Sequence, residues 1–310
     1  MDTTSQASTD NSHCAVGGGP VLAEAAGHPG PRWRAGLSTI AVAIVLAVVV
    51  LPVPRAHAGE LPAAIEPHFR VDPILDTVLT GAAAGATMLT EIILSTGEIV
   101  PQPVTPGSAD KIWSFDRLAI TQTIDPHAGL YSNVGLGVAL GFAVLDPILS
   151  GVREGPRATL VDGIMYAESL SLTAFLTDLT KIAVRRPRPI DYRDPSVSNT
   201  DRVLSFFSGH ASSTAAAAAT ASYLAFVRWP HTARPWITLV AGTLLTAFVS
   251  YQRVRAGAHF PTDVIAGSMA GGSIGVIVPH IHRVHPGGPD FWFALAPTEG
   301  GGKMTFGRRF

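Results

Sequence analysis

The chain has 310 residues, of which 47% are hydrophobic and only 15% charged, so it can bury a large core and carries less charge than an average soluble protein. A formal net charge of -1, without any long run of like charge, argues against nucleic acid as a partner. The single cysteine, Cys14, excludes a disulfide framework and a thiolate metal site. Function must therefore be inferred from motifs, and membrane contact is compatible with the composition.

The N-terminal part of the chain is predicted to be an export region. Residues 1–34 are rich in Gly, Ser, Thr, Ala and Pro and have no periodic apolar pattern, so we expect them to be disordered. Two arginines then precede an apolar run at 37–53, and a small-residue sequence ending at Ala58 follows it. This order of basic, apolar and small residues predicts a signal peptide or N-terminal anchor over 35–58.

Beyond residue 70, long apolar runs alternate with segments marked by Pro or paired Arg, a pattern that favours helices over strands. We predict an all-α fold, an antiparallel six-helix bundle over 70–282, in which the Pro-rich stretch 99–127 is a long connection. In the tail, 283–310, glycines at 300–302 favour a short β-hairpin. The predicted helices cover 76–95, 133–149, 159–184, 208–227, 235–253 and 261–281.

Two cations are expected at the end of the third helix. That helix leaves through the sequence KIAVRRPRP, whose prolines cannot continue it. Lys181 therefore lies in the last turn and Arg188 just beyond the exit. Favourable placement against the helix dipole, or the basic flank of a membrane helix, is the purely structural alternative.

The fourth helix opens with Ser208, Gly209 and His210. Ser208 suits the N-cap position and leaves the first backbone N–H groups free to face an anion, while Gly209 removes side-chain bulk from its approach. His210 is then placed to give a proton to whatever leaves that anion. A serine cap followed by glycine also begins many helices that have no catalytic role.

The third motif lies between the fifth and sixth helices, in the sequence YQRVRAGAHFPTD. Here His259 follows Arg253 by six residues, and Asp263 follows His259 by four. We expect Asp263 to accept the Nδ1–H of His259 and so expose Nε2 as a nucleophile. A hydrogen bond on a helix surface is the alternative interpretation of this spacing.

In an antiparallel bundle, the three motifs meet at one end, where they could bind a phosphate group. We predict in-line attack by His259 on phosphorus, protonation of the leaving oxygen by His210, and hydrolysis of the resulting phosphohistidine by water. The phosphate oxygens would be bound by Lys181, Arg188 and Arg253 and by the helix start at Ser208 and Gly209.

Taken together, the motifs resemble the type 2 phosphatidic acid phosphatase superfamily, which includes bacterial acid phosphatases, lipid phosphate phosphatases and vanadium haloperoxidases. The family pattern has a lysine seven residues before Arg-Pro, then Pro-Ser-Gly-His, then Ser-Arg followed by His and Asp. Phe207 stands where the family has proline, and Gln252 where it has serine. The matching residues are Lys181, Arg188, Pro189, Ser208, Gly209, His210, Arg253, His259 and Asp263.

The resemblance implies a phosphatase without a metal cofactor, to which vanadate could bind as a phosphate mimic. A lipid phosphate or an isoprenoid pyrophosphate is the favoured substrate, because apolar helices adjoin the predicted pocket. The alternatives are a soluble nonspecific periplasmic acid phosphatase, a vanadate-dependent haloperoxidase, and a non-catalytic membrane protein that binds or transports a phospholipid.

Localisation to the cell envelope follows from the signal and from apolar runs at 235–252 and 264–282, which approach the roughly 20 residues of a membrane span. We expect a membrane-associated or inner-membrane bundle whose site faces the periplasm, as in the family, with a soluble periplasmic protein as the alternative. A cleaved signal followed by six crossings would instead place the site in the cytoplasm, so one of these assumptions has to fail.

Other polar residues are interpreted as surface groups. The arginines around the third helix exit are expected to form a solvated loop, and the acids of that helix an exposed stripe. The histidines after the last helix are expected at the surface without a metal, because no spaced carboxylates or cysteines lie near them in the sequence. These residues are Arg185, Arg186, Arg193 and Arg202; Asp162, Glu168 and Asp178; and His280, His282 and His285.

Overall fold

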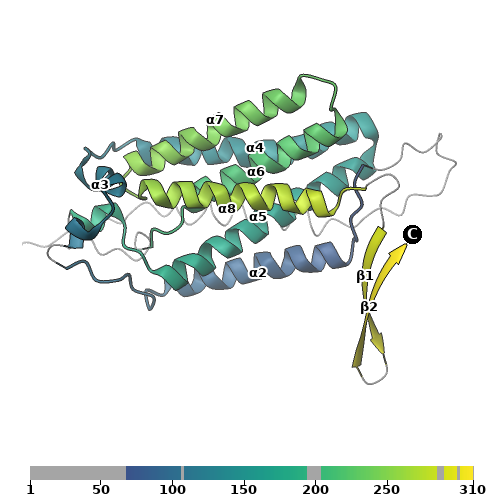
Figure 1. The fold of residues 1–310 in the computed structure, drawn as a ribbon, viewed down its shortest axis with the longest axis horizontal. Helices are drawn as coiled ribbons and strands as arrows, with labels where there is room; N and C mark the ends of the chain where they lie inside the picture. Colours follow the sequence, from purple (N-terminus) through teal and green to yellow (C-terminus); the bar gives the residue numbers. More distant parts are fainter. Residues whose placement is uncertain (1–67, 106–107, 194–203, 285–289, 299–300, 310) are drawn as a thin grey trace, which may run out of the picture. The chain divides into compact units, whose positions relative to one another are not determined.

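The computed structural model describes residues 68–105, 108–193, 204–284, 290–298 and 301–309. Six long helices among them form a bundle in which successive helices run in opposite directions, so the predicted all-α fold is confirmed (Figure 1). The predicted disordered segment 1–34 and the signal at 35–58 lie outside the described residues. The long helices are α2 (Leu75–Ser95), α4 (Ala128–Glu154), α5 (Pro156–Val184), α6 (Gly209–Arg228), α7 (Arg234–Arg255) and α8 (Pro261–Ile281).

Short helices occupy the connections that the sequence leaves irregular. The stretch between α2 and α4 contains the 3-10 turn η1 (Ser108–Lys111) and the helix α3 (Ser114–Thr121), and η2 (Pro189–Tyr192) follows α5. Helix α4 also begins five residues earlier than the predicted start at Asn133, at Ala128. The long connection is therefore partly helical, and it lies beside the end of the bundle at which α4, α6 and α8 begin (Figure 1).

Close contact between α6 and α8 sets the geometry of that end. Gly267 and Gly271 of α8 lie against the backbone of Ser208 and Ser212 of α6; a Cβ atom at Gly267 would come within 2.7 Å of the Ser208 carbonyl oxygen. The two glycines of α8 are four residues apart, as are the two serines of α6, so each pair lies along one face of its helix. Small residues on these faces let the two backbones approach closely. Because the two helices run parallel, this packing brings their N-termini side by side.

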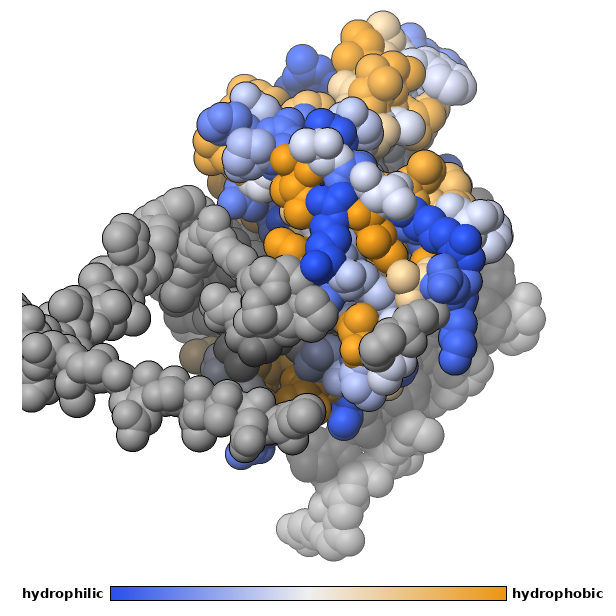
Figure 2. Space-filling view, turned by 90° about the vertical axis from the view of Figure 1, so that its left-hand side faces the viewer, coloured by the Kyte–Doolittle hydropathy of each residue, from blue (hydrophilic) through white to orange (hydrophobic). Residues whose placement is uncertain are grey.

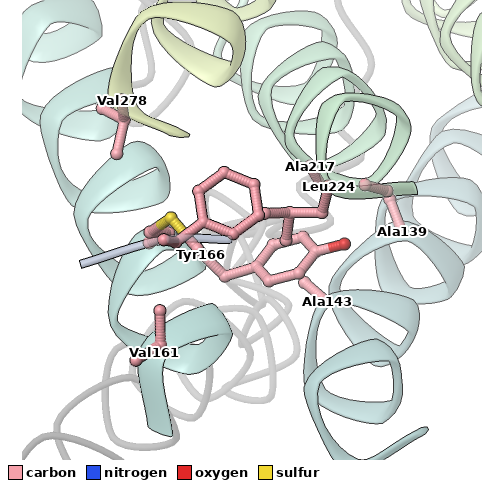
Figure 3. Packing of buried hydrophobic residues seen from close by; sticks show 10 residues of the cluster. Ala139, Ala143, Val161, Tyr166, Ala217, Leu224 and Val278 are labelled. Atoms are coloured by element: carbon pink, nitrogen blue, oxygen red, sulfur yellow. The ribbon is translucent and has the colours of Figure 1, made fainter. Parts of the chain in front are cut away.

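The apolar core lies farther from these N-termini, where α4, α5, α6 and α8 meet (Figure 3). Met165 and Leu224 are fully buried there, and Tyr166 donates a hydrogen bond of 2.9 Å to Asp146. Small alanines from α4 and α6 surround these larger side chains and allow the helices to pack closely. The residues labelled in Figure 3 are Ala139, Ala143, Val161, Tyr166, Ala217, Leu224 and Val278.

A buried ionic network joins the helices at the end of α6 that is remote from its N-terminus. Arg228 lies 2.5 Å from Asp162 and also pairs with Glu154, while Arg234 pairs with Asp146. Asp162 has no exposed surface. The expected exposed stripe of acids on α5 is therefore wrong: Asp162, Glu168 and Asp178 are all buried. Arg228 pairs with Asp162, and Lys181 pairs with Asp178.

The outer surface of the bundle is strongly apolar. Helices α2, α4, α7 and α8 are each long and apolar enough to cross a membrane, and α7 buries only 6% of its most apolar stretch inside the bundle. Large aliphatic and aromatic side chains such as Val152, Trp236 and Met269 are exposed on these helices. Long apolar helices with many exposed apolar side chains are typical of contact with lipid, so the expected membrane association is supported.

The tail forms the hairpin that its glycines predict. Strands β1 (Asp290–Thr298) and β2 (Gly301–Arg309) pair antiparallel, with Thr298 opposite Gly301 at the closed end.

Candidate active site

The predicted site residues lie at the ends of four helices on the same side of the bundle. Helices α5 and α7 end there, and α6 and α8 begin there (Figure 1). Figure 2 shows this end of the molecule, where hydrophilic side chains gather among apolar ones. The arrangement brings the three motifs, which lie at four helix ends, into one region.

The exit of α5 carries the first two cations. The last turn holds Lys181, whose Nζ atom lies 3.0 Å from Oδ1 of the buried Asp178. The chain leaves the helix through Arg185, which adopts the left-handed conformation; Arg188 is extended, and Pro189 begins η2. The backbone N–H of Arg188 donates to Asp191 at 2.7 Å, which ties this arginine to the start of η2.

The entry to α6 has the predicted cap. The Ser208 side chain accepts a hydrogen bond from the backbone N–H of Ala211, and its own backbone N–H donates to the Asp263 carbonyl oxygen at 3.1 Å. The ring of His210 contacts α4, because its Nε2 atom lies 2.8 Å from Oδ1 of Asn133. If Nε2 donates to this oxygen, Nδ1 is the ring atom left for proton transfer.

The His259 ring is held differently from the expected arrangement. Its Nδ1 atom lies 2.7 Å from the backbone carbonyl oxygen of Ser205 but 3.8 Å from Oδ2 of Asp263. A carbonyl oxygen only accepts hydrogen bonds, so Nδ1 carries the proton and Nε2 keeps its lone pair. The expected direct hydrogen bond to Asp263 is thus replaced by one to Ser205, although the resulting tautomer is the same.

The carboxylate of Asp263 accepts hydrogen bonds from donors other than His259. Oδ2 accepts from the Phe260 backbone N–H at 2.8 Å and from the Ser205 hydroxyl, and Oδ1 accepts from Arg186 at 2.5 Å. The first of these bonds caps the start of α8, where an acidic side chain is also favoured by the helix dipole. Asp263 therefore fixes the loop that holds His259 and supplies negative charge near its ring.

Arg186 is the main residue that the motifs do not predict at this site. Its guanidinium group bridges Asp263 and Asp116, at 2.5 and 2.8 Å, and lies 3.9 Å from the centre of the Phe260 ring. The buried Asp116 also accepts from the Thr262 backbone N–H at 3.0 Å. The expected solvated loop is therefore wrong for Arg186, which joins α3, the α5 exit and the start of α8.

The neighbouring arginines behave in different ways. Arg193 donates to the backbone carbonyl oxygens of Ile120 and Gln122, so it also holds the α3 segment, whereas Arg185 is exposed. Arg202 lies outside the described residues.

The two histidines and three cations are close enough to interact electrostatically. Arg253, His259, Lys181 and Arg188 all act on His210, and Arg253, Arg188 and Asp263 act on His259. Burial, followed by the positive charges of Arg253 and Arg188, lowers the pKa of His259 from 6.5 to about 3, against the opposing effect of Asp263. His259 is therefore neutral over the physiological pH range, which is the form that acts as a nucleophile.

Residues 162–285 match the model of the PAP2 superfamily, and this segment contains every predicted site residue. A crystal structure described as the first transmembrane PAP2 type phosphatidylglycerolphosphate phosphatase from Bacillus subtilis is similar to the chain, with a TM-score of 0.44 and 18% sequence identity over 64% of this chain and 94% of that one. No curated protein matches the chain.

The family match supports a phosphatase, as the motifs predict. The match to the PAP2 superfamily model over residues 162–285 agrees with the resemblance seen in the sequence.

Proposed function

We propose that the protein hydrolyses a lipid phosphate or an isoprenoid pyrophosphate at the membrane, through a phosphohistidine formed on His259. The observation that carries this proposal is the state of His259: Nδ1 is bound to the Ser205 carbonyl oxygen, so Nε2 retains its lone pair beside two arginines. A neutral imidazole next to fixed positive charge is suited to attack an anionic phosphoryl group.

In the first step, Nε2 of His259 attacks phosphorus in line with the ester oxygen. The P–O bond breaks as the P–N bond forms, and the departing oxygen takes a proton from the protonated, imidazolium form of His210, which becomes neutral. In the second step, His210 accepts a proton from water, whose oxygen attacks phosphorus and breaks the P–N bond. Inorganic phosphate and neutral His259 are the products.

The cations around the site would stabilise charge in both steps. Lys181 and Arg188 at the α5 exit and Arg253 in the last turn of α7 all act on His210, and the α6 start adds backbone N–H groups. These groups supply the electrostatic stabilisation that a divalent ion gives in other phosphatases, so we propose that the chemical step needs no metal. Vanadate, which has the shape and charge of phosphate, is expected to inhibit by occupying the same groups.

A lateral groove supports a substrate with an apolar chain. The groove lies between α6, α7 and α8, has a volume of about 450 Å³, and is lined mainly by apolar surface. Its lining includes Ser250, three residues before Arg253, and Val264, directly after Asp263. One end of the groove therefore adjoins the proposed phosphate site, so a lipid could place its headgroup there and its chain between the helices.

Filling the groove should separate lipid from soluble substrates. A Cβ atom at Gly272, which lines the groove, meets nothing within 4 Å, so the side chain of Gly272→Leu can leave the backbone there and should occupy the groove. We expect kcat/KM for a long-chain lipid phosphate to fall about tenfold or more, the effect of one or two lost apolar contacts, and that for a short-chain phosphate ester to change little. Phosphate release from both substrates measures the ratio.

Gly141→Leu provides the matched control, because Gly141 is an exposed helix glycine on α4 with open space around its Cβ position. It should change neither activity. Equal losses on both substrates in Gly272→Leu would contradict the assignment of the groove.

The low pKa of His259 predicts activity at acidic pH. An unshifted histidine with a pKa near 6.5 would be about 97% protonated at pH 5, which would lower the rate about thirtyfold relative to its neutral form. Since the pKa of His259 is about 3, its neutral nucleophilic form persists at pH 5. The acid limb of kcat/KM should therefore show no titration near pH 6.5 from the nucleophile.

The pH profile should be measured with an ester whose own ionisation is known and divided out. An acid limb that still follows one group of pKa near 6.5 would contradict the proposed state of His259.

A substrate panel tests the proposed function and orientation together. Detergent-solubilised protein should release inorganic phosphate from lipid phosphates faster than from soluble esters, and spheroplasts should hydrolyse an added impermeant ester without being opened. Preference for soluble esters would favour the nonspecific acid phosphatase. Vanadate-dependent halide oxidation would indicate the haloperoxidase, and lipid binding without phosphate release would indicate the non-catalytic carrier. Hydrolysis only after lysis would place the site on the cytoplasmic side.

A further inference from the structure

A second cluster of ionisable side chains lies away from the phosphate site. It consists of Asp76 at the start of α2, Glu168 in the middle of α5 and His282 just after α8, which are 5%, 3% and 8% exposed. Their carboxylate oxygens and imidazole nitrogen lie within 4.8 Å of one another. Glu168 is thirteen residues, or about 20 Å of helix, before Lys181, so the cluster takes no part in the proposed chemistry.

The orientation of His282 requires a cation at the centre of the cluster. Its Nδ1 atom lies 2.8 Å from the Val278 carbonyl oxygen, so Nδ1 carries a proton. Its Nε2 atom lies 3.2 Å from Oδ2 of Asp76 and 3.7 Å from Oε2 of Glu168. A lone pair on Nε2 would face two carboxylates, which is repulsive unless a proton or a metal ion lies between them.

A metal ion can interact with all three side chains of the cluster, whereas a proton on His282 can be shared with only one of the two carboxylates. A proton on Nε2 can be shared with Asp76, but 3.7 Å is too long for a hydrogen bond to Glu168. Oε2 of Glu168 is buried and has no hydrogen-bond partner among the described residues. Leaving a buried carboxylate oxygen unsatisfied is costly, so this atom points to a ligand at the centre of the cluster.

The two separations around the imidazole nitrogen also suit a tetrahedral ion. Zinc binds imidazole nitrogen and carboxylate oxygen at about 2.0–2.2 Å, which places neighbouring ligand atoms about 3.3–3.6 Å apart in a tetrahedron. The separations of 3.2 and 3.7 Å around Nε2 lie close to this range. A hydrogen bond from the other ring nitrogen to a backbone carbonyl, as made to Val278, is typical of a metal-bound histidine.

We propose that Asp76, Glu168 and His282 bind one divalent transition-metal ion of the zinc type. Two carboxylates and a neutral imidazole balance the charge of the ion, and water can complete its coordination. The ion would fasten α2 to α5 and α8 at the point where Arg70 N–H donates to the His282 carbonyl oxygen at 2.8 Å. The role of the ion would be structural. His282 is buried and is therefore not the surface residue that the sequence suggests.

Cobalt binding to the full-length protein in detergent tests the site. After removal of metal with a chelator, the wild type should bind one Co²⁺ per chain with the visible absorption of a tetrahedral complex, and Zn²⁺ should displace it. Zn²⁺ should also raise the thermal midpoint of unfolding. Glu168→Gln and His282→Gln should each weaken Co²⁺ binding at least tenfold and abolish the thermal shift.

His280→Gln is the matched control, since this exposed histidine is two residues away and contacts Tyr223 instead. It should bind Co²⁺ like the wild type. Phosphate release should survive chelation, which separates this proposal from the proposed function. Folded wild-type protein that binds no Co²⁺, or Glu168→Gln protein that binds it normally, would overturn the assignment.

Discussion

Replacing His259 with glutamine should abolish phosphate release and leave the bundle folded. We expect kcat to fall on the order of 10⁴-fold or more, as it does when a covalent nucleophile is removed from a catalytic unit. Glutamine keeps a polar group near the Ser205 carbonyl oxygen, to which the imidazole now donates, and fills much of the buried space. Turnover of a soluble phosphate ester and the thermal midpoint of unfolding should be measured on the same preparation.

The covalent step can be examined separately from the overall rate. A rapidly quenched reaction of the wild type should contain acid-labile phosphate on the protein, and the His259→Gln variant should contain none. His231→Gln, at an exposed position on the α6–α7 connection, should behave like the wild type in both measurements. Phosphate release by His259→Gln at a rate near that of the wild type would remove the basis of the mechanism.

The largest loss of stability is expected for Arg228→Met. Arg228 is 4% exposed at its side chain and compensates Asp162, which is 0% exposed, together with Glu154. Methionine fills similar space but leaves two carboxylates without their cation. Breaking a buried ion pair in this way lowers the free energy of unfolding by about 3–5 kcal/mol. Denaturant or thermal unfolding in detergent would measure the change.

Arg234→Met is the comparison, because the Arg234 side chain is 22% exposed and its partner Asp146 keeps the hydrogen bond from Tyr166. Arg234→Met should lower the free energy of unfolding clearly less than Arg228→Met does. Adding Asp162→Asn to Arg228→Met should restore part of the lost stability, since it removes the uncompensated charge. An Arg228→Met protein as stable as the wild type would show that this network contributes little to the fold.

The predictable part of the site consists of residues at helix ends. Lys181 and Arg188 flank a proline-marked exit and Ser208 begins a long alanine-rich run, so local rules for helix ends place these residues. The alternation of helix directions then predicts which ends meet. The same reasoning predicts the tautomer of His259 but assigns it to the wrong acceptor.

The acceptor was missed because it is a backbone atom. The Ser205 carbonyl oxygen has no side-chain signature, and its approach to His259 depends on how the segment before α6 lies against the start of α8. Arg186 was missed for a related reason: nothing local distinguishes it from Arg185, and its partner Asp116 lies in a short helix within a predicted connection. Contacts between residues far apart in the sequence therefore decide which groups hold the catalytic residues in place.

The buried acids of α5 show the same limit in the core. Asp162 and its partner Arg228 are 66 residues apart, and Glu168 meets His282 only when the last helix has docked. A polar residue in a long helix is ordinarily interpreted as exposed, because an unpaired buried charge is costly. Only the assembled bundle shows which groups lie beside these buried acids.

The short backbone pairing between Phe69 and Arg283 has a consequence for the topology of the bundle. It brings the segment before α2 and the segment after α8 into direct contact, so residues 68 and 284 could be joined by a brief peptide. New termini could then be opened in the exposed turn around His231. Such a circular permutant should assemble the same helices in a different chain order, because their packing does not depend on which one is synthesised first.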